Sequence, residues 1–124
     1  MRIIETKNAP AAIGPYSQAV EAGNTLYISG QIPLDPVTMA LISEDVKVQT
    51  DQCLKNLKAI IDEAGYTLDH VVKCGIFLAD MNDFAVVNEV YGKYFATHKP
   101  ARACVEVARL PRDVKVEIEA IAVK

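Results

Sequence analysis

The sequence predicts an α+β fold, in which two helices pack on one face of a mixed β-sheet and the element order is β-β-α-β-α-β-β. Two segments carry apolar residues at three- and four-residue spacing, which is typical of amphipathic helices. Between them, Val71–Ala79 is almost entirely apolar, as expected of a strand buried on both faces. A chain of 124 residues is long enough for a real core, so we expect one domain spanning residues 1–124.

The first expected element is a β-hairpin over Ala19–Ile32. It turns at Gly23-Asn24, and its second strand contains the β-rich run Leu26–Gly30. Pro33 and Pro36 then end that strand and begin a loop, because proline cannot donate a ladder hydrogen bond.

The first helix is expected to start at Ser43-Glu44-Asp45, where acidic side chains face the positive end of the helix dipole. Gly65 is expected to end it in the left-handed conformation. Because a helix joins two strands here, one strand pair in the sheet should be parallel. The apolar face predicted to meet the core is Cys53, Leu54, Leu57, Ile60, Ile61 and Ala64.

The second helix follows the apolar strand, and either Asp80 or Asn82 can cap it. Asn88 falls on or beside its apolar stripe. A buried amide usually has a structural partner, although it can also bind a ligand. The stripe itself consists of Phe84, Val87, Tyr91 and Phe95.

The C-terminal stretch is predicted to form two paired strands on either side of Leu110-Pro111. Matching their apolar faces determines the register, since a slip of one residue would turn every side chain over. The charged and thiol side chains then share the opposite face. The predicted pairs are Val105 with Val116, Cys104 with Glu117, Arg102 with Glu119 and Glu106 with Lys115.

This face has two interpretations. Charged pairs on a two-stranded ribbon are commonly a solvated surface, worth about 0–1 kcal/mol each. Alternatively, an arginine, a thiol and carboxylates within reach of one another form a site. Because both helices cover the other side of the sheet and Cys104 favours burial, we expect a second copy of the chain to cover this face.

Composition narrows the class of partner. The formal net charge is −3 and no basic stripe is present, which disfavours nucleic-acid binding as the main function. Three cysteines without metal-ligand spacing argue against a disulfide framework or a metal site, and His70 and His98 are isolated. Without a signal peptide or a run long enough to span a bilayer, the expected location is the cytoplasm.

Three segments carry recognisable motifs: Ala9–Ala19 (APAAIGPYSQA), Ser29–Pro33 (SGQIP) and the stretch from Pro100-Ala101-Arg102 to Glu117-Ile118. Together they resemble the reactive intermediate deaminase family, also called the YjgF or Rid family. The similarity runs over nearly the whole chain with the motifs in order. Because Arg102 and Glu117 are both present, the chain resembles the branch that hydrolyses imines.

The resemblance implies a fold similar to bacterial chorismate mutase, a homotrimer with sites in clefts between adjacent chains. It also implies 2-iminobutanoate/2-iminopropanoate deaminase activity. Such enzymes convert 2-aminoacrylate-derived 2-imino acids into 2-keto acids and ammonia without a metal or organic cofactor. Pyridoxal-phosphate-dependent serine/threonine dehydratases make these imines, so a functional link to them is expected.

The site residues follow from that substrate. Arg102 is expected to hold its carboxylate through two parallel hydrogen bonds, and Glu117 to act as general base on the attacking water. Cys104 is expected to position the substrate rather than attack it, since imine hydrolysis needs no covalent intermediate. Backbone groups at Ser29-Gly30 are expected to bind the substrate's other polar atoms. Tyr16 and Asn88 are expected to line the cleft.

Two other functions stay open. The first is a protein that senses keto acids or modulates a partner protein, which would bind a ligand in the same cleft without turnover. The second is ribonuclease activity, as in some relatives of the family, which the acidic balance of this chain disfavours.

One departure from the family concerns residues 35–45, where relatives usually have glycine near Thr38-Met39 and before Asp45. This chain has Met39 and Glu44, which leaves the turn geometry open.

Overall fold

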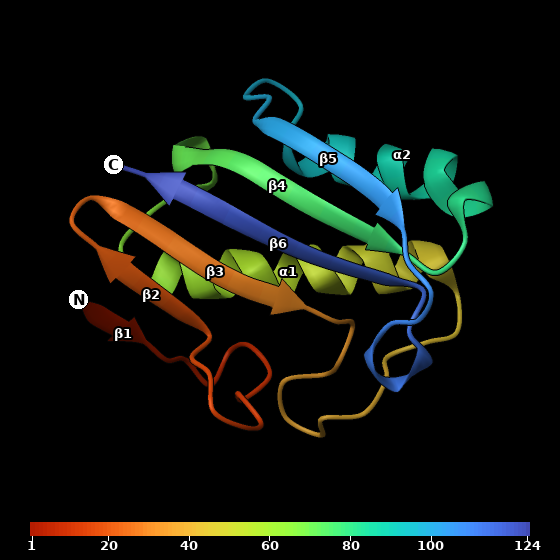
Figure 1. Ribbon diagram of the computed structural model, residues 1–124, viewed down its shortest axis with the longest axis horizontal. Helices are drawn as coiled ribbons and strands as arrows, with labels where there is room; N and C mark the ends of the chain where they lie inside the picture. Colours follow the sequence, from red (N-terminus) through yellow and green to blue (C-terminus); the bar gives the residue numbers. More distant parts are fainter.

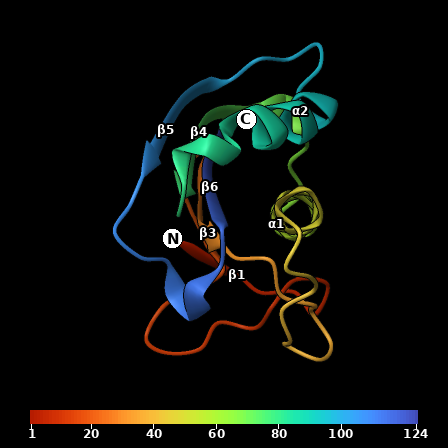
Figure 2. The same cartoon turned by 90° about the vertical axis from the view of Figure 1, so that its right-hand side faces the viewer.

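The computed structural model describes residues 1–124 and shows a six-stranded mixed sheet with two helices on one face (Figures 1 and 2). The predicted α+β fold is confirmed. Its helices are α1 (Val46–Glu63) and α2 (Phe84–Tyr94). The strands are β1 (Arg2–Ile4), β2 (Ala19–Ala22), β3 (Thr25–Gln31), β4 (Val71–Leu78), β5 (Ala101–Glu106) and β6 (Val116–Val123). The three-residue strand β1 was not predicted, because its length is too short to show alternation.

The strand order is β1-β2-β3-β6-β4-β5. All neighbours run antiparallel except β4 and β5, which are parallel and joined through α2. This confirms the predicted parallel pair, and the β2–β3 hairpin around Gly23 is also confirmed. The last strand, β6, is therefore a central strand that lies between β3 and β4 (Figure 1).

Both ends of α1 follow the chemistry expected of them. The Asp45 Oδ1 atom accepts hydrogen bonds from the backbone N–H groups of Lys47 (2.7 Å) and Val48 (3.4 Å). The acidic residues thus precede the helix and cap it, rather than lying inside its first turn. After Ala64, Gly65 adopts φ +83°, the left-handed conformation predicted for it.

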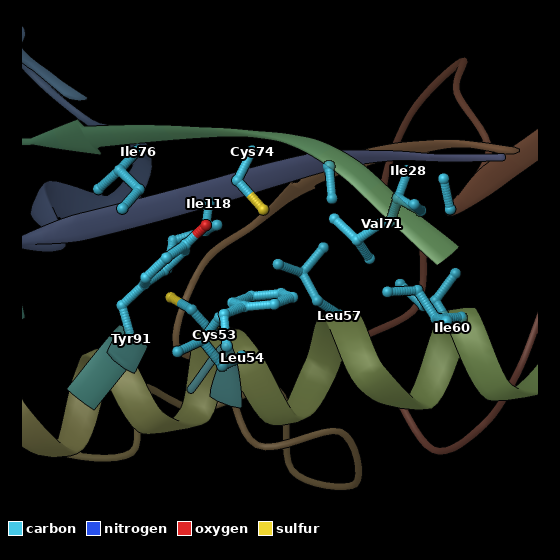
Figure 3. Packing of buried hydrophobic residues seen from close by; sticks show 14 of the residues in the cluster. Ile28, Cys53, Leu54, Leu57, Ile60, Val71, Cys74, Ile76, Tyr91 and Ile118 are labelled. Carbon is cyan, nitrogen blue, oxygen red and sulfur yellow. The ribbon is translucent and has the colours of Figure 1, made fainter. Parts of the chain in front are cut away.

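The core lies between the sheet and the two helices (Figure 3). Cys53, which was predicted to be a core residue, is fully buried there. The side chains of β4 are buried only on the side that faces the helices. On the other side they reach the surface, where Val72 is 43% exposed. The prediction that both faces of this strand would be buried is wrong for the single chain, because no helix covers the second face of the sheet.

The predicted pairing of the two C-terminal strands is also wrong. Strand β4 lies between β5 and β6, so that Ile76 pairs with Cys104 on one side and with Ile118 on the other. Residues 107–115 carry the chain from one flank of β4 to the other. Alternation in a sequence shows which side chains share a face of a strand, but it does not show which strand is the neighbour.

This topology separates residues that were predicted to lie together. Arg102 and Cys104 pair with Cys74 and Ile76, whose side chains point to the helices, so both lie on the helix side of the sheet. Glu117 pairs with Phe77 and lies on the opposite, open face. The predicted common face for Arg102, Cys104 and Glu117 therefore does not exist within one chain.

The loop that lacks the family's glycines has a strained turn. Met39 adopts φ 61°, a left-handed conformation that costs a residue with a Cβ about 1–3 kcal/mol. The Asp35 Oδ1 atom accepts the backbone N–H groups of Val37 (2.8 Å) and Thr38 (2.9 Å), and Arg112 Nη1 donates to the Met39 carbonyl at 2.7 Å. These hydrogen bonds hold the turn despite its missing glycine.

Candidate functional site

The open face of the sheet positions one carboxylate against a glycine. Glu117 of β6 extends over Gly30 of β3, where a Cβ atom on residue 30 would lie 2.2 Å from Glu117 Oε2. Only glycine leaves room for the carboxylate in this position. Burial raises the pKa of Glu117 above its ordinary value, and the like charge of Glu119 raises it further. A carboxyl group with a raised pKa exchanges protons closer to neutral pH.

Tyr16 lies beside Gly30 and Ser29 of β3. Tyr16 is 53% exposed, and it lines a cavity of about 220 Å³ together with Gly30. Its hydroxyl accepts a hydrogen bond from the backbone N–H of Ile13 at 3.3 Å. The Ser29 hydroxyl donates to the Ser17 carbonyl at 2.6 Å and so fastens the N-terminal loop to β3. The structure therefore places Tyr16 beside Ser29 and beside Gly30, the residue that Glu117 lies over.

A second group surrounds Arg102 on the helix side of the sheet. Arg102 Nη1 donates to Asn88 Oδ1 at 2.8 Å, which gives the amide of α2 the partner expected for it. The guanidinium lies over the ring of Tyr91 at 4.9 Å from the centroid, and over the ring of Phe84 at 5.6 Å. Arg102 has no carboxylate partner, because the four ion pairs of the chain involve other residues. Its charge is held in place but not neutralised.

Tyr91 was assigned only to the apolar stripe of α2, yet it supports Arg102. It is one helical turn after Asn88, and that spacing is the signal that would have found it. Figure 3 shows Tyr91 extending from α2 toward the sheet, on which Cys74 lies. Its hydroxyl is buried without a hydrogen-bond partner. Burial, and secondarily the neighbouring Cys74, raise the pKa of Tyr91, so the phenol stays protonated.

Cys104 lies two residues after Arg102 on the same side of β5 and packs against the core. Burial raises the pKa of its thiol, and the opposing effect of Arg102 is smaller. Glu117, predicted to pair with Cys104, lies on the other face of the sheet. A protonated, half-buried thiol is a poor nucleophile, in agreement with a positioning role.

Each chain thus carries two groups of candidate site residues. The helix-side group contains Asn88, Arg102 and Cys104, and the open-face group contains Glu117 over Gly30. They lie on opposite faces of the sheet with β4 between β5 and β6. One chain therefore cannot bring the arginine and the carboxylate onto the same small molecule.

Nothing in the side-chain arrangement resembles a metal centre, since no three His, Cys, Asp or Glu residues converge as ligands would. Neither helix has the length and apolar character needed to cross a membrane.

Known proteins share both the sequence and the fold of this chain. A family model described as Endoribonuclease L-PSP matches residues 6–124. The chain is 59% identical to RutC family protein PH0854 of Pyrococcus horikoshii, covering 98% of this chain and 97% of that protein. It is 55% identical to the 2-iminobutanoate/2-iminopropanoate deaminase of Salmonella typhimurium, covering 99% and 98%. The solved structure of E. coli TdcF with bound serine matches with a TM-score of 0.95 at 50% identity, covering 100% of this chain and 99% of TdcF.

The shared architecture is thus that of small α+β proteins with two helices on one six-stranded sheet. The chain belongs to the Endoribonuclease L-PSP family, which is the Rid/YjgF family indicated by the three sequence segments. At this identity the relatives include a named imine deaminase, which supports an enzyme of the deaminase class.

Proposed function

We propose that the protein hydrolyses the C=N bond of small 2-imino acids to give 2-oxo acids and ammonia. The observation that carries the proposal is Arg102, a guanidinium held by Asn88 and Tyr91 and left without a carboxylate partner. An arginine in this state is ready to bind the carboxylate of a ligand. The name of the Salmonella relative and the serine bound by TdcF, an amino acid with such a carboxylate, support the same ligand class.

Arg102 contributes binding and orientation. Its planar guanidinium can donate two parallel hydrogen bonds to the substrate carboxylate, which lysine cannot reproduce. Because Asn88 and the Tyr91 ring already hold the side chain, little conformational freedom is lost when the substrate binds. The imine carbon, next to the bound carboxylate, is thereby placed at a defined position.

Glu117 contributes proton transfer. The substrate reacts as the protonated imine. As the water oxygen bonds to its carbon, Glu117 takes a proton from the water and the π electrons of the C=N bond move to nitrogen, which gives a neutral carbinolamine. Glu117 then passes that proton to the amine nitrogen, the C–N bond breaks with its electron pair leaving on ammonia, and Glu117 takes the hydroxyl proton as the oxygen becomes the carbonyl of the 2-oxo acid. Its raised pKa suits both directions of transfer.

We further propose that the complete site forms between copies of the chain in a homotrimer. Arg102 and Glu117 lie on opposite faces of one sheet, so a neighbouring copy must supply one of them. The open face carries exposed apolar side chains, among them Tyr27 (50% exposed) and Val105 (45% exposed). Burying these side chains against another copy would stabilise the assembly and exclude water around Glu117.

The activity is tested by adding the purified protein to a serine/threonine dehydratase that acts on threonine, and following the release of 2-oxobutanoate. We expect release to be faster than spontaneous hydrolysis. Glu117→Gln should lower kcat about 10²–10⁴-fold, the usual contribution of a general base. Arg102→Met should lower kcat/KM about 10–100-fold, from the loss of charged hydrogen bonds. Arg109→Met, which removes an exposed arginine paired with Asp113, is the matched control.

Mixing two impaired variants tests the shared site. When Arg102→Met and Glu117→Gln chains are co-expressed, each variant keeps the group that the other lacks. A site between copies is then complete wherever the Arg102 of one chain faces the Glu117 of the other. Random assembly of equal amounts then restores about one quarter of the wild-type activity. If the mixture is as inactive as either variant alone, the site does not form between copies.

A binding protein that senses oxo acids is the second candidate, since TdcF was crystallised with a bound small molecule. It predicts that oxo-acid binding survives in Glu117→Gln, and that no imine-hydrolysis rate above background is seen in any preparation. Ribonuclease activity, named in the family description, is the weaker alternative. The net charge of −3 opposes binding to a polyanion, so RNA cleavage should disappear on stringent repurification.

A further inference from the structure

A cavity of about 390 Å³ lies beside Arg102, between α2 and the start of β5. Its volume is within the range of about 300–1,000 Å³ found for pockets that hold drug-sized ligands. Two cations line it, Arg102 and Lys99, together with Asn88, Tyr91 and Phe95. No acidic residue is among its lining residues.

Neither cation is neutralised by the protein. Lys99 makes no ion pair, and Arg102 has only neutral partners, the amide of Asn88 and the rings of Tyr91 and Phe84. By contrast, Arg109 near the same end of the chain has a carboxylate at 2.6 Å. Two unpaired positive charges facing one concave surface create a positive potential that attracts anions.

The two cations are also suitably spaced for one small ligand. Lys99 precedes Arg102 by three residues, so their Cα atoms are at most about 11 Å apart. Both residues line the same cavity. A ligand with a single carboxylate would engage Arg102 and leave Lys99 without a partner. A ligand with carboxylates at both ends would engage both.

We propose that Lys99 makes this site selective for 2-imino and 2-oxo dicarboxylic acids. Arg102 binds the carboxylate next to the reacting carbon, and Lys99 binds the distal one. This inference rests on the proposed function, because it uses Arg102 as the carboxylate-binding group. Lys99 is exposed, so solvent limits its contribution to about three- to tenfold in affinity, and added salt weakens it.

The test is a pair of ligands that differ in the distal group. Isothermal titration of the intact protein with 2-oxoglutarate and with 2-oxopentanoate compares five-carbon oxo acids with and without a second carboxylate. We expect wild type to bind 2-oxoglutarate more tightly at low ionic strength. Lys99→Met should lower 2-oxoglutarate affinity about three- to tenfold and leave 2-oxopentanoate unchanged. Lys93→Met is the control, since Lys93 is an exposed lysine of α2 outside the cavity.

Equal effects of Lys99→Met on both ligands, or no effect on either, would overturn the inference. So would tighter binding of 2-oxopentanoate by wild type. These outcomes are distinct from failure of the proposed function, because titration measures binding without turnover. A protein that hydrolyses imines but ignores Lys99 refutes only the selectivity. A protein that prefers 2-oxoglutarate but never hydrolyses an imine refutes only the activity.

Discussion

Replacing Gly30 with alanine tests whether the position of Glu117 matters. The added methyl group would lie 2.2 Å from Glu117 Oε2, 3.0 Å from Cδ and 3.2 Å from Cγ. An ordinary contact needs about 3.4 Å, so the carboxylate must move by about 1.2 Å. The obstructed atoms form the flexible end of a side chain, and Gly30 has no left-handed φ. The backbone therefore accepts alanine while the carboxylate moves.

The expected result is a large loss of rate with little loss of stability. A displacement of about 1 Å in a catalytic group can cost about 100-fold in rate, which corresponds to about 2.7 kcal/mol of activation free energy. The free energy of unfolding should change by less than about 1 kcal/mol, since alanine loses less backbone entropy than glycine on folding.

The assay is the dehydratase-coupled release of 2-oxobutanoate, with urea unfolding measured on the same samples. Gly75→Ala is the matched control. It adds a methyl group to the same face, 3.1 Å from Glu119 Cγ, and should leave the rate within about threefold of wild type. If Gly30→Ala keeps a kcat within twofold of wild type, the reasoning about Glu117 is refuted. The reasoning is equally refuted if the rate falls only in proportion to the fraction of the variant that is unfolded.

Three further perturbations follow from the same contacts. Glu119→Gln removes a like charge that raises the pKa of Glu117, so the acidic limb of the kcat/KM profile should move to lower pH; an unmoved limb would contradict this. Glu117→Gln should raise the melting temperature at neutral pH. The pKa of Glu117 is higher in the folded chain than its unfolded value of 4.5, so the protonated carboxyl group stabilises the fold in acid and this stability is lost as the pH rises through the folded pKa. The difference in melting temperature between Glu117→Gln and wild type should therefore vanish in acid. Asp45→Ala removes the cap of α1 and should cost about 1 kcal/mol in urea unfolding, without changing kcat.

Much of the fold could be predicted from local patterns. The stripe of apolar residues in α1 follows the period of a helix, and Asp45 and Gly65 mark its ends by their backbone chemistry. A parallel pair somewhere in the sheet was expected from the crossover through α1, and the structure has one, although it is β4 with β5. These features depend on residues close together in the chain, which is why the sequence shows them directly.

The candidate site was predictable residue by residue but not as an arrangement. Arg102, Asn88 and Glu117 could be named from the sequence, yet placing Arg102 and Glu117 on one face was wrong. The error came from assuming that strands adjacent in sequence are adjacent in the sheet. The support of Arg102 by Tyr91 was missed, because an aromatic residue at helical spacing is equally typical of a core.

The sequence by itself determined which side chains share a face of each strand and helix, because that depends only on the backbone period. It also determined the chemical types available for a site. Only the tertiary structure decided that β4 lies between β5 and β6, since strand order depends on which buried faces pack together across the whole chain. This strand order places Arg102 on the helix side of the sheet and Glu117 on the open face. It separated the residues of one predicted site into two groups on opposite faces of the sheet, which under our proposal meet between copies of the chain.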